Sequence, residues 1–239
     1  MKVACLSDIH GYINQFSEIF PGIDLVILPG DFCSLDRQDE QEKEFPGITE
    51  KLREMFPDAQ EFIVVPGNHD YLLDSLSKSW DPDLAFRKLL GADFKVLIDE
   101  RYTFLNLLTG ESLEIYGAPR TDLWMAFPRL HGSVDIKRIP LGIDILVTHE
   151  APRWYSLDCV KEYVGRYGTS EPGNELLYER VRIVKPKYHI FGHIHRNCIK
   201  DNGNTIFINC SQMNGSEFLP QVRVFEIVPP ERHQNLINE

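Results

Sequence analysis

The sequence predicts an α/β fold, because buried strands and amphipathic helices alternate along its 239 residues. Short runs of β-branched and aromatic residues recur, and each ends at a breaker or a polar cluster, which is typical of a buried strand. Charged stretches with apolar residues at helical spacing lie between these runs. Two pairs of short runs around turn residues add antiparallel hairpins to this alternation.

Five apolar runs are expected to form the buried strands. They are residues 3–6, 25–28, 62–65, 143–147 and 188–191. Continuous apolar runs of this length are typical of strands that are buried on both faces of a sheet. Residues 222–228 are expected to add a last strand near the C-terminus.

Three helices are expected between the strands. Residues 41–56 place apolar side chains near helical spacing among mixed charges. Residues 83–90 end at Gly91, a typical helix stop. Residues 174–184 begin at Asn174, a good capping residue, and end just before a proline.

Two hairpins are expected beside the alternating elements. The first joins residues 101–107 to 112–116, and the second joins residues 198–200 to 205–209 across an Asn-Gly turn signal. Residues 119–140 are expected to form the longest irregular stretch. Long loops of this kind in compact domains are often functional.

Length and composition indicate one globular domain over residues 1–239, with 43% hydrophobic and 26% charged residues. A formal net charge of −11 argues against a protein that coats nucleic acid. No apolar run approaches the roughly 20 residues of a membrane span, and we expect no signal peptide. The five cysteines are scattered and odd in number, which favours a reducing compartment, so we expect a cytoplasmic protein.

Polar residues that can bind metal follow each of the five predicted strands. They are Asp8, His10, Asp31, Asn68, His69, His149, His193 and His195. Because ligands of α/β sheets gather at the carboxyl ends of strands, we expect these groups to share one crevice. Imidazole and carboxylate together suit Mn, Fe, Zn or Ni, whereas oxygen ligands alone suit Mg or Ca.

These residues belong to five motifs that follow one another in a fixed order. They are Asp8-x-His10, Gly30-Asp31, Gly67-Asn68-His69-Asp70, the strand-end His149 and Gly192-His193-x-His195. Together they resemble the calcineurin-like metallophosphoesterase superfamily. The resemblance implies a four-layer sandwich, in which helices flank two packed mixed β-sheets, and a two-metal site at the edge of the sheets.

The resemblance also implies how the ligands are divided. One metal would be held by Asp8, His10 and His195, and the other by Asn68, His149 and His193. Asp31 would bridge both, since two neighbouring cations need an anion to offset their repulsion. The expected cofactors are two divalent metal ions, with Mn first and Fe, Zn, Ni or Mg as alternatives.

The family pattern further implies in-line attack on phosphorus by a hydroxide that bridges the two metals. His69 would stabilise the transition state or protonate the leaving oxygen, and Asp70 would orient its imidazole. Arg120 and Arg196 are expected to contact substrate, because guanidinium groups match phosphate oxygens. His131 is a further candidate for a substrate contact.

A closer resemblance is to the metallophosphoesterase-domain (MPPED-type) branch of the superfamily. It rests on residues 65–69, 116–119, 147–149, 184–192, 207–211 and 228–230. Residues 30–37 depart from the Gly-Asp-x-Val-Asp-Arg-Gly motif of Ser/Thr protein phosphatases. The branch implies a phosphodiesterase that acts on small phosphodiesters, including cyclic nucleotides. Glu150 stands where the branch often has Gly, and it adds a negative charge beside the site.

Two other functions remain open at the level of sequence. A phosphomonoesterase would use the same two-metal machinery and differ only in the residues that surround the pocket. A non-catalytic interaction module of the same fold would have lost metal ligands, and none is missing here. We expect a small phosphoester as the partner, with nucleotides as candidates, and neither extended nucleic acid nor a membrane. The sequence carries no sign of the oligomeric state.

Overall fold

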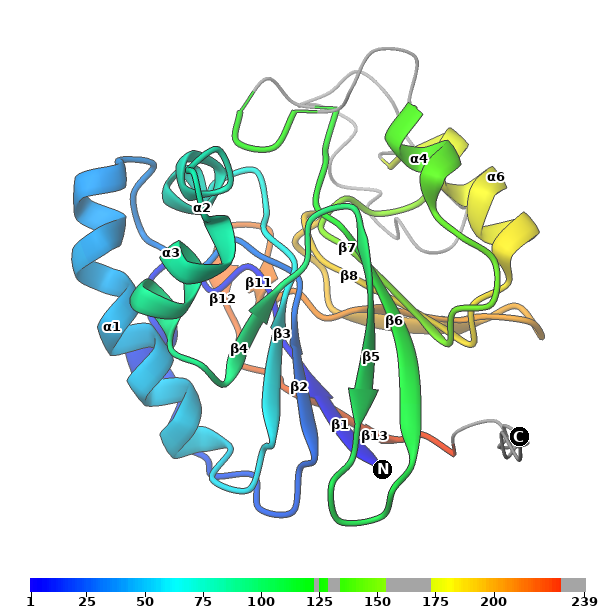
Figure 1. Cartoon of the computed structure of the whole chain (residues 1–239), viewed down its shortest axis with the longest axis horizontal. Helices are drawn as coiled ribbons and strands as arrows, with labels where there is room; N and C mark the ends of the chain where they lie inside the picture. Colours follow the sequence, from blue (N-terminus) through cyan, green and yellow to red (C-terminus); the bar gives the residue numbers. More distant parts are fainter. Residues whose placement is uncertain (123–124, 129–133, 154–172, 229–239) are drawn as a thin grey trace, which may run out of the picture.

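Two mixed β-sheets lie face to face, and helices cover their outer faces (Figure 1). The computed structural model describes residues 1–122, 125–128, 134–153 and 173–228. No helix within these ranges is both long enough and apolar enough to cross a membrane. The arrangement confirms the four-layer sandwich that the sequence predicts.

The first sheet has the strand order β13-β1-β2-β3-β4. Its strands are β1 (Lys2–Cys5), β2 (Leu25–Leu28), β3 (Glu61–Val64), β4 (Phe94–Val96) and β13 (Arg223–Glu226). Strands β1 to β4 run parallel, whereas β13 pairs antiparallel with β1. The carboxyl ends of β1, β2 and β3 therefore meet at one edge of the sheet.

The second sheet has the strand order β5-β6-β7-β8-β10-β9. Its strands are β5 (Glu100–Leu105), β6 (Ser112–Ala118), β7 (Ile145–Thr148), β8 (Tyr188–Phe191), β9 (Cys198–Asp201) and β10 (Ile206–Asn209). Both predicted hairpins, β5–β6 and β9–β10, are present and antiparallel. Strands β6, β7, β8 and β10 are parallel, so the ends of β7 and β8 also share an edge.

The helices divide between the two outer faces. Beside the first sheet lie η1 (Tyr12–Gln15), α1 (Gln38–Met55), α2 (Tyr71–Leu76) and α3 (Pro82–Leu90) (Figure 1). Beside the second sheet lie α4 (Val134–Arg138) and α6 (Glu175–Val184). A small ribbon of β11 (Met213–Asn214) and β12 (Glu217–Phe218) completes the described elements.

Alternation along the strands produces separate apolar layers. Ala4 and Val26 lie opposite each other in β1 and β2 and pack in the cluster that contains α1 and α3. The next pair, Cys5 and Ile27, faces the other way and packs against Ile145 of the second sheet. The strands are thus buried on both faces, which explains why their sequences are continuously apolar.

The predicted helices form with small changes at their ends. Asn174 caps α6 as expected, because its side chain accepts a hydrogen bond from the backbone N–H of Leu177 at 2.8 Å. Residues 119–140 were predicted to form an irregular stretch, and this is corrected by the short helix α4 within them. The short elements η1, α2, β4, β11 and β12 were not predicted. Elements of two to six residues depend on tertiary contacts, which local periodicity does not reveal.

His189 is a buried core residue of β8, as the sequence suggested, and it makes folding sensitive to acid. The hydroxyl of Thr148 donates to the carbonyl oxygen of Glu150 at 2.6 Å, so His189 Nε2–H donates to Thr148 Oγ1 at 2.9 Å. Burial lowers the pKa of His189 from 6.5 to about 3. The unfolded chain therefore binds an extra proton between these values, and stability is lost as the pH falls below about 6.5.

Lowering the pH from 7 to 5 should reduce the free energy of unfolding of the wild type by about 2 kcal/mol more than that of His189→Phe. Urea unfolding of both proteins at the two pH values measures this difference. Equal losses of stability in the two proteins would show that another group carries the acid sensitivity.

Candidate metal centre

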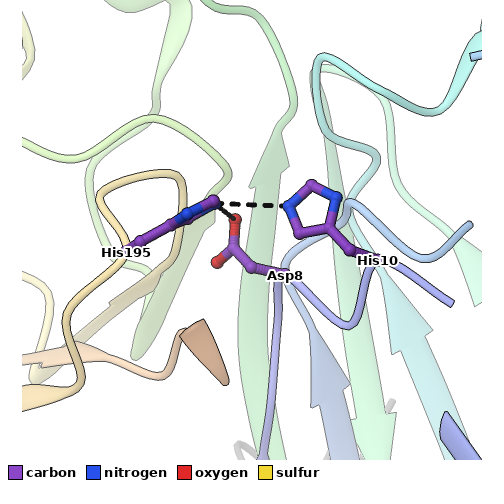
Figure 2. A group of neighbouring side chains, drawn as sticks. All are labelled: Asp8, His10 and His195. Atoms are coloured by element: carbon purple, nitrogen blue, oxygen red, sulfur yellow. Dashed lines mark hydrogen bonds and ion pairs between the residues drawn. The ribbon is translucent and has the colours of Figure 1, made fainter. Parts of the chain in front are cut away.

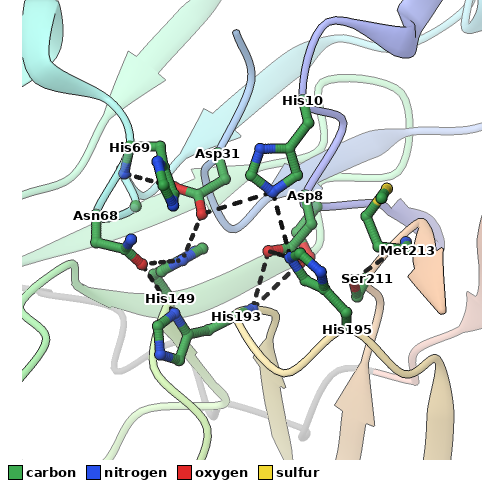
Figure 3. A network of polar contacts seen from close by, with 12 residues as sticks. Asp8, His10, Asp31, Asn68, His69, His149, His193, His195, Ser211 and Met213 are labelled. Carbon is green, nitrogen blue, oxygen red and sulfur yellow. Dashed lines mark hydrogen bonds and ion pairs between the residues drawn. The ribbon is translucent and has the colours of Figure 1, made fainter. Parts of the chain in front are cut away.

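The predicted ligands come together where the carboxyl ends of the strands meet (Figure 3). Three strands of the first sheet supply Asp8 and His10, Asp31, and Asn68 with His69. Two strands of the second sheet supply His149, and His193 with His195. The site is therefore shared by both sheets, and it joins residues from Asp8 to His195.

One group consists of Asp8, His10 and His195, whose potential ligand atoms all lie within 4.8 Å of one another (Figure 2). The Nε2 atoms of His10 and His195 are 3.3 Å apart, and His195 Nε2 is 3.7 Å from Asp8 Oδ1. His195 Nδ1 lies 2.8 Å from the carbonyl oxygen of Gly215, to which it donates a hydrogen. That bond leaves a lone pair on Nε2, directed at the other two residues, as in a metal-binding imidazole.

A second group consists of Asp8, Asp31 and His149. His149 Nε2 lies 3.1 Å from Asp31 Oδ2, and its Nδ1 lies 2.6 Å from the carbonyl oxygen of Pro29. Asn68 Oδ1 extends this group, because it is 3.0 Å from His149 Nε2 and 2.8 Å from His193 Nδ1. Buried carboxylate, amide and imidazole atoms thus converge on one point.

Asp31 belongs to the second group and also lies close to the first. Its Oδ2 atom is 4.0 Å from His10 Nε2 and 3.1 Å from His149 Nε2. Asp31 and Asp8 are almost completely buried, and a buried pair of carboxylates is costly unless cations offset the charge. The donor set therefore fits divalent cations of the Mn, Fe, Ni or Zn type. The first group has the members predicted for one cation, whereas the second contains Asp8 and Asp31 beside His149, so the division of ligands between two cations stays a prediction.

The ionisation of the ligands reflects their mutual contacts. Burial is the largest single effect on Asp31 and would raise its pKa, but the charge and hydrogen bond of His149, together with the charges of His69 and His10, hold this pKa well below its usual range. Burial would lower the pKa of His149, but Asp31 outweighs it and raises this pKa to about 9. Burial and the charge of His149 lower the pKa of His193 to about 4.

The backbone at the ligands adopts a conformation that most residues avoid. The φ angles are 53° at Asp8, 45° at His10, 59° at Asp31 and 67° at His193. Aspartate and histidine tolerate this left-handed region better than bulky residues, but each instance still costs free energy. Clustering of such residues at one sheet edge is typical of a functional site rather than of a scaffold.

Gly192 has no side chain, which leaves space for a neighbouring side chain that is predicted to bind metal. A methyl group there would overlap Ser7 Oγ and Asp8 Oδ2, which are joined by a 2.7 Å hydrogen bond. We expect Gly192→Ala to weaken Mn²⁺ binding at least about tenfold, because Asp8 must move. Titration calorimetry with Mn²⁺ measures the loss.

Gly47→Ala is the matched control for this variant, since nothing lies within 4 Å of the added methyl group in α1. It should bind Mn²⁺ normally and be more stable by up to about 1 kcal/mol. Unchanged Mn²⁺ affinity in Gly192→Ala would contradict the proposed position of Asp8.

His69 projects beside the ligands without joining either group. Its ring centroid lies 5.3 Å from that of His10, and its backbone N–H donates to Asp31 Oδ1 at 2.9 Å. Its Nδ1 atom lies 2.7 Å from Asp36 Oδ1. Burial would lower the pKa of His69, but Asp31 and Asp36 outweigh it and raise this pKa.

The prediction that Asp70 orients the His69 imidazole is wrong. The carboxylate of Asp70 accepts hydrogen bonds from the backbone N–H groups of Asp31 at 2.9 Å, Phe32 at 3.1 Å and Gly67 at 2.7 Å. Both of its oxygens are used, and the carboxylate that meets His69 is Asp36. Burial and the charge of Asp31 raise the pKa of Asp70 to about 7, although the three backbone hydrogen bonds by themselves would lower it. Asp70 thus fixes the two loops that carry Asp31 and Asn68.

Three further residues were predicted to contact substrate, namely Arg120, Arg196 and His131. Arg120 Nε contacts Asp99 Oδ2 at 2.6 Å, and its Nη1 donates to the carbonyl oxygen of Pro128 at 3.3 Å. Arg196 is exposed and follows His195 directly. His131 lies outside the described residues. Binding of substrate by these three residues stays a prediction.

Two features of the site were missed at the level of sequence. Asp36 stands in the loop after Asp31, and a second carboxylate in a strand-end loop was the signal that could have identified it. The carbonyl oxygens of Pro29 and Gly215, which fix His149 and His195, carry no sequence signal at all, because every residue has a carbonyl group.

Comparison with known proteins agrees with this geometry. UPF0046 protein K07C11.7 of Caenorhabditis elegans is 28% identical over 235 residues, which cover 95% of this chain and 75% of that protein. Metallophosphoesterase domain-containing protein 1 of Homo sapiens is 27% identical over 226 residues, which cover 88% of this chain and 65% of that protein. The solved structure of TT1561 of Thermus thermophilus superimposes with a TM-score of 0.53 at 12% identity, covering 87% of this chain and 88% of that one.

The sequence profile described as calcineurin-like phosphoesterase matches residues 1–197. This range includes every predicted metal ligand, from Asp8 to His195. The chain belongs to the calcineurin-like phosphoesterase family, whose members are metal-dependent.

Proposed function

We propose that this protein is a dinuclear metal-dependent phosphodiesterase that hydrolyses small phosphodiesters such as cyclic nucleotides. The observation that supports the proposal is the convergence of carboxylate and imidazole groups in two adjoining clusters that share Asp8. Asp31 Oδ2 of the second cluster also lies 4.0 Å from His10 Nε2 of the first. Because both sheets contribute ligands, we also propose that residues 1–239 act as one catalytic domain. Mn²⁺ as the native metal and the cytoplasm as the location are part of the same proposal.

The ligands would be divided as the sequence predicts. Asp8, His10 and His195 would hold one cation, Asn68, His149 and His193 the other, and Asp31 both. When bound, the two cations would polarise a phosphoryl oxygen and lower the pKa of a water molecule. The protein would contribute the fixed positions of the ligands and the groups that handle protons.

His69 is the group proposed to handle the proton of the leaving group. Its ring lies beside His10, and its Nδ1 atom is engaged by Asp36. Nε2 is therefore the nitrogen that remains to give a proton to the leaving oxygen. An adjacent carboxylate supports this role, because it stabilises the protonated form of the ring.

The charge of the surroundings supports a diester rather than a monoester. A diester carries one negative charge near neutral pH, whereas a monoester carries close to two. Glu150 follows the ligand His149, and its Oε1 atom accepts a hydrogen bond from the backbone N–H of Asp122 at 3.2 Å. A formal net charge of −11 adds to this negative field, which disfavours the more highly charged substrate.

The test uses the full-length protein loaded with Mn²⁺ and assayed with bis(p-nitrophenyl) phosphate, p-nitrophenyl phosphate and a cyclic nucleotide. Faster turnover of the two diesters than of the monoester supports the proposal, and chelation of the metal should abolish that turnover. Faster turnover of the monoester would favour a phosphomonoesterase. Two bound equivalents of metal with no turnover of any substrate would overturn the proposal. A site that stays empty when metal is added would favour a non-catalytic module.

A further inference from the structure

Asn68 is the only predicted ligand with a side-chain amide, whose oxygen and NH₂ group are similar in size and can exchange places by rotation. The oxygen of an amide can bind a cation, whereas its NH₂ group cannot. In this structure Oδ1 faces His149 Nε2 at 3.0 Å and His193 Nδ1 at 2.8 Å (Figure 3). A contact on the other side of the amide that accepts only from NH₂ would favour the same orientation.

That contact is made by Met125. Its Sδ atom lies 3.3 Å from Asn68 Nδ2, and the two residues are 57 positions apart in the sequence. A thioether sulfur carries no hydrogen, so it can accept a hydrogen bond but cannot donate one. Met125 is therefore compatible only with the NH₂ end of the amide, which leaves the oxygen to face the two imidazoles.

The backbone around Met125 is held firmly against Asn68. The N–H of Ala126 donates to the backbone carbonyl oxygen of Asn68 at 3.1 Å. Phe127 is only 1% exposed and packs in the same apolar cluster as α1, and its carbonyl oxygen accepts from the N–H of Thr121 at 3.1 Å. Its φ angle is 49°, which is strained for a bulky side chain and persists only where the surroundings enforce it.

We propose that Met125 is a positioning residue that selects the orientation of the Asn68 amide and so completes the cation site of Asn68, His149 and His193. In this proposal residues 125–127 affect the metal centre through Asn68 and not through contact with substrate. The inference rests on the proposed function, since it needs a cation at that group. It predicts that the two cation sites respond differently to one substitution.

The experiment compares the wild type with Met125→Leu and Met125→Gln by calorimetric titration with Mn²⁺. Leucine keeps the volume of methionine and removes the acceptor, whereas the glutamine oxygen restores an acceptor. We expect Met125→Leu to lower the affinity for one of the two Mn²⁺ ions about tenfold and to leave the affinity for the other unchanged. Met125→Gln should stay within about threefold of the wild type at both sites. Met55→Leu, in the buried part of α1, is the matched control and should bind as the wild type does.

Each outcome decides between the alternatives. If Met125→Leu binds both equivalents with wild-type affinity, the role of Met125 is wrong although the metal centre stands. If leucine and glutamine weaken binding equally, the loss does not depend on a hydrogen-bond acceptor at position 125, which also overturns the inference. If Met125→Leu does not fold, Met125→Gln decides alone, because it must retain both affinities. A wild type that binds fewer than two cations would instead overturn the proposed function itself.

Discussion

Replacing Asp31 with asparagine is expected to lower diester hydrolysis by at least about a thousandfold, equivalent to roughly 4 kcal/mol of transition-state stabilisation. Asp31 Oδ2 is the atom that approaches both His10 and His149, so in the proposed centre its charge would serve both cations. An amide has the same shape but no charge to offset the repulsion between two cations. Initial rates with bis(p-nitrophenyl) phosphate and the metal content of the purified protein measure the effect.

A surface aspartate provides the matched control for this prediction. Asp201 lies in the β9–β10 hairpin, where its Oδ1 accepts from the N–H of Gly203 at 2.7 Å, a contact that asparagine can keep. Asp201→Asn should retain both activity and metal. Full activity in Asp31→Asn, with two metals bound, would show that the carboxylate does not link the two sites.

The strand-end ligands could be predicted from the sequence because each follows a local signal. Asp8, Asp31 and His149 come directly after short apolar runs, and parallel strands bring such positions to one edge. Neither the pairing of distant strands nor the order within each sheet was needed for this step. The motifs therefore predicted where these side chains converge, while the division of the strands into two sheets was implied by the family resemblance.

The partners of His69 and Asn68 could not be predicted, because they depend on the paths of loops. Asp70 is adjacent to His69 in sequence, but its carboxylate accepts hydrogen bonds from three backbone N–H groups instead. Asp36 reaches His69 only because the loop after β2 turns back toward it. Met125 lies in a stretch predicted to be irregular, and no periodicity connects it to Asn68.

Replacing His69 with alanine is expected to lower kcat by about a hundred- to a thousandfold, which is the usual contribution of a general acid. The side chain belongs to neither ligand group, and the backbone N–H that donates to Asp31 remains in alanine. Metal content and KM should therefore change little, in contrast to Asp31→Asn. Steady-state kinetics and metal analysis of the same preparation separate the two effects.

Asp36→Asn distinguishes a positioning contact from a structural one. The side chains of His69 and Asp36 are 33% and 51% exposed, so their contact at 2.7 Å adds little to folding stability. Asparagine can still accept a hydrogen bond from Nδ1, but it no longer stabilises the protonated ring. We expect kcat to fall about tenfold, less than in His69→Ala, with no further loss when both substitutions are combined. Losses that multiply in the double variant would mean that Asp36 acts independently of His69.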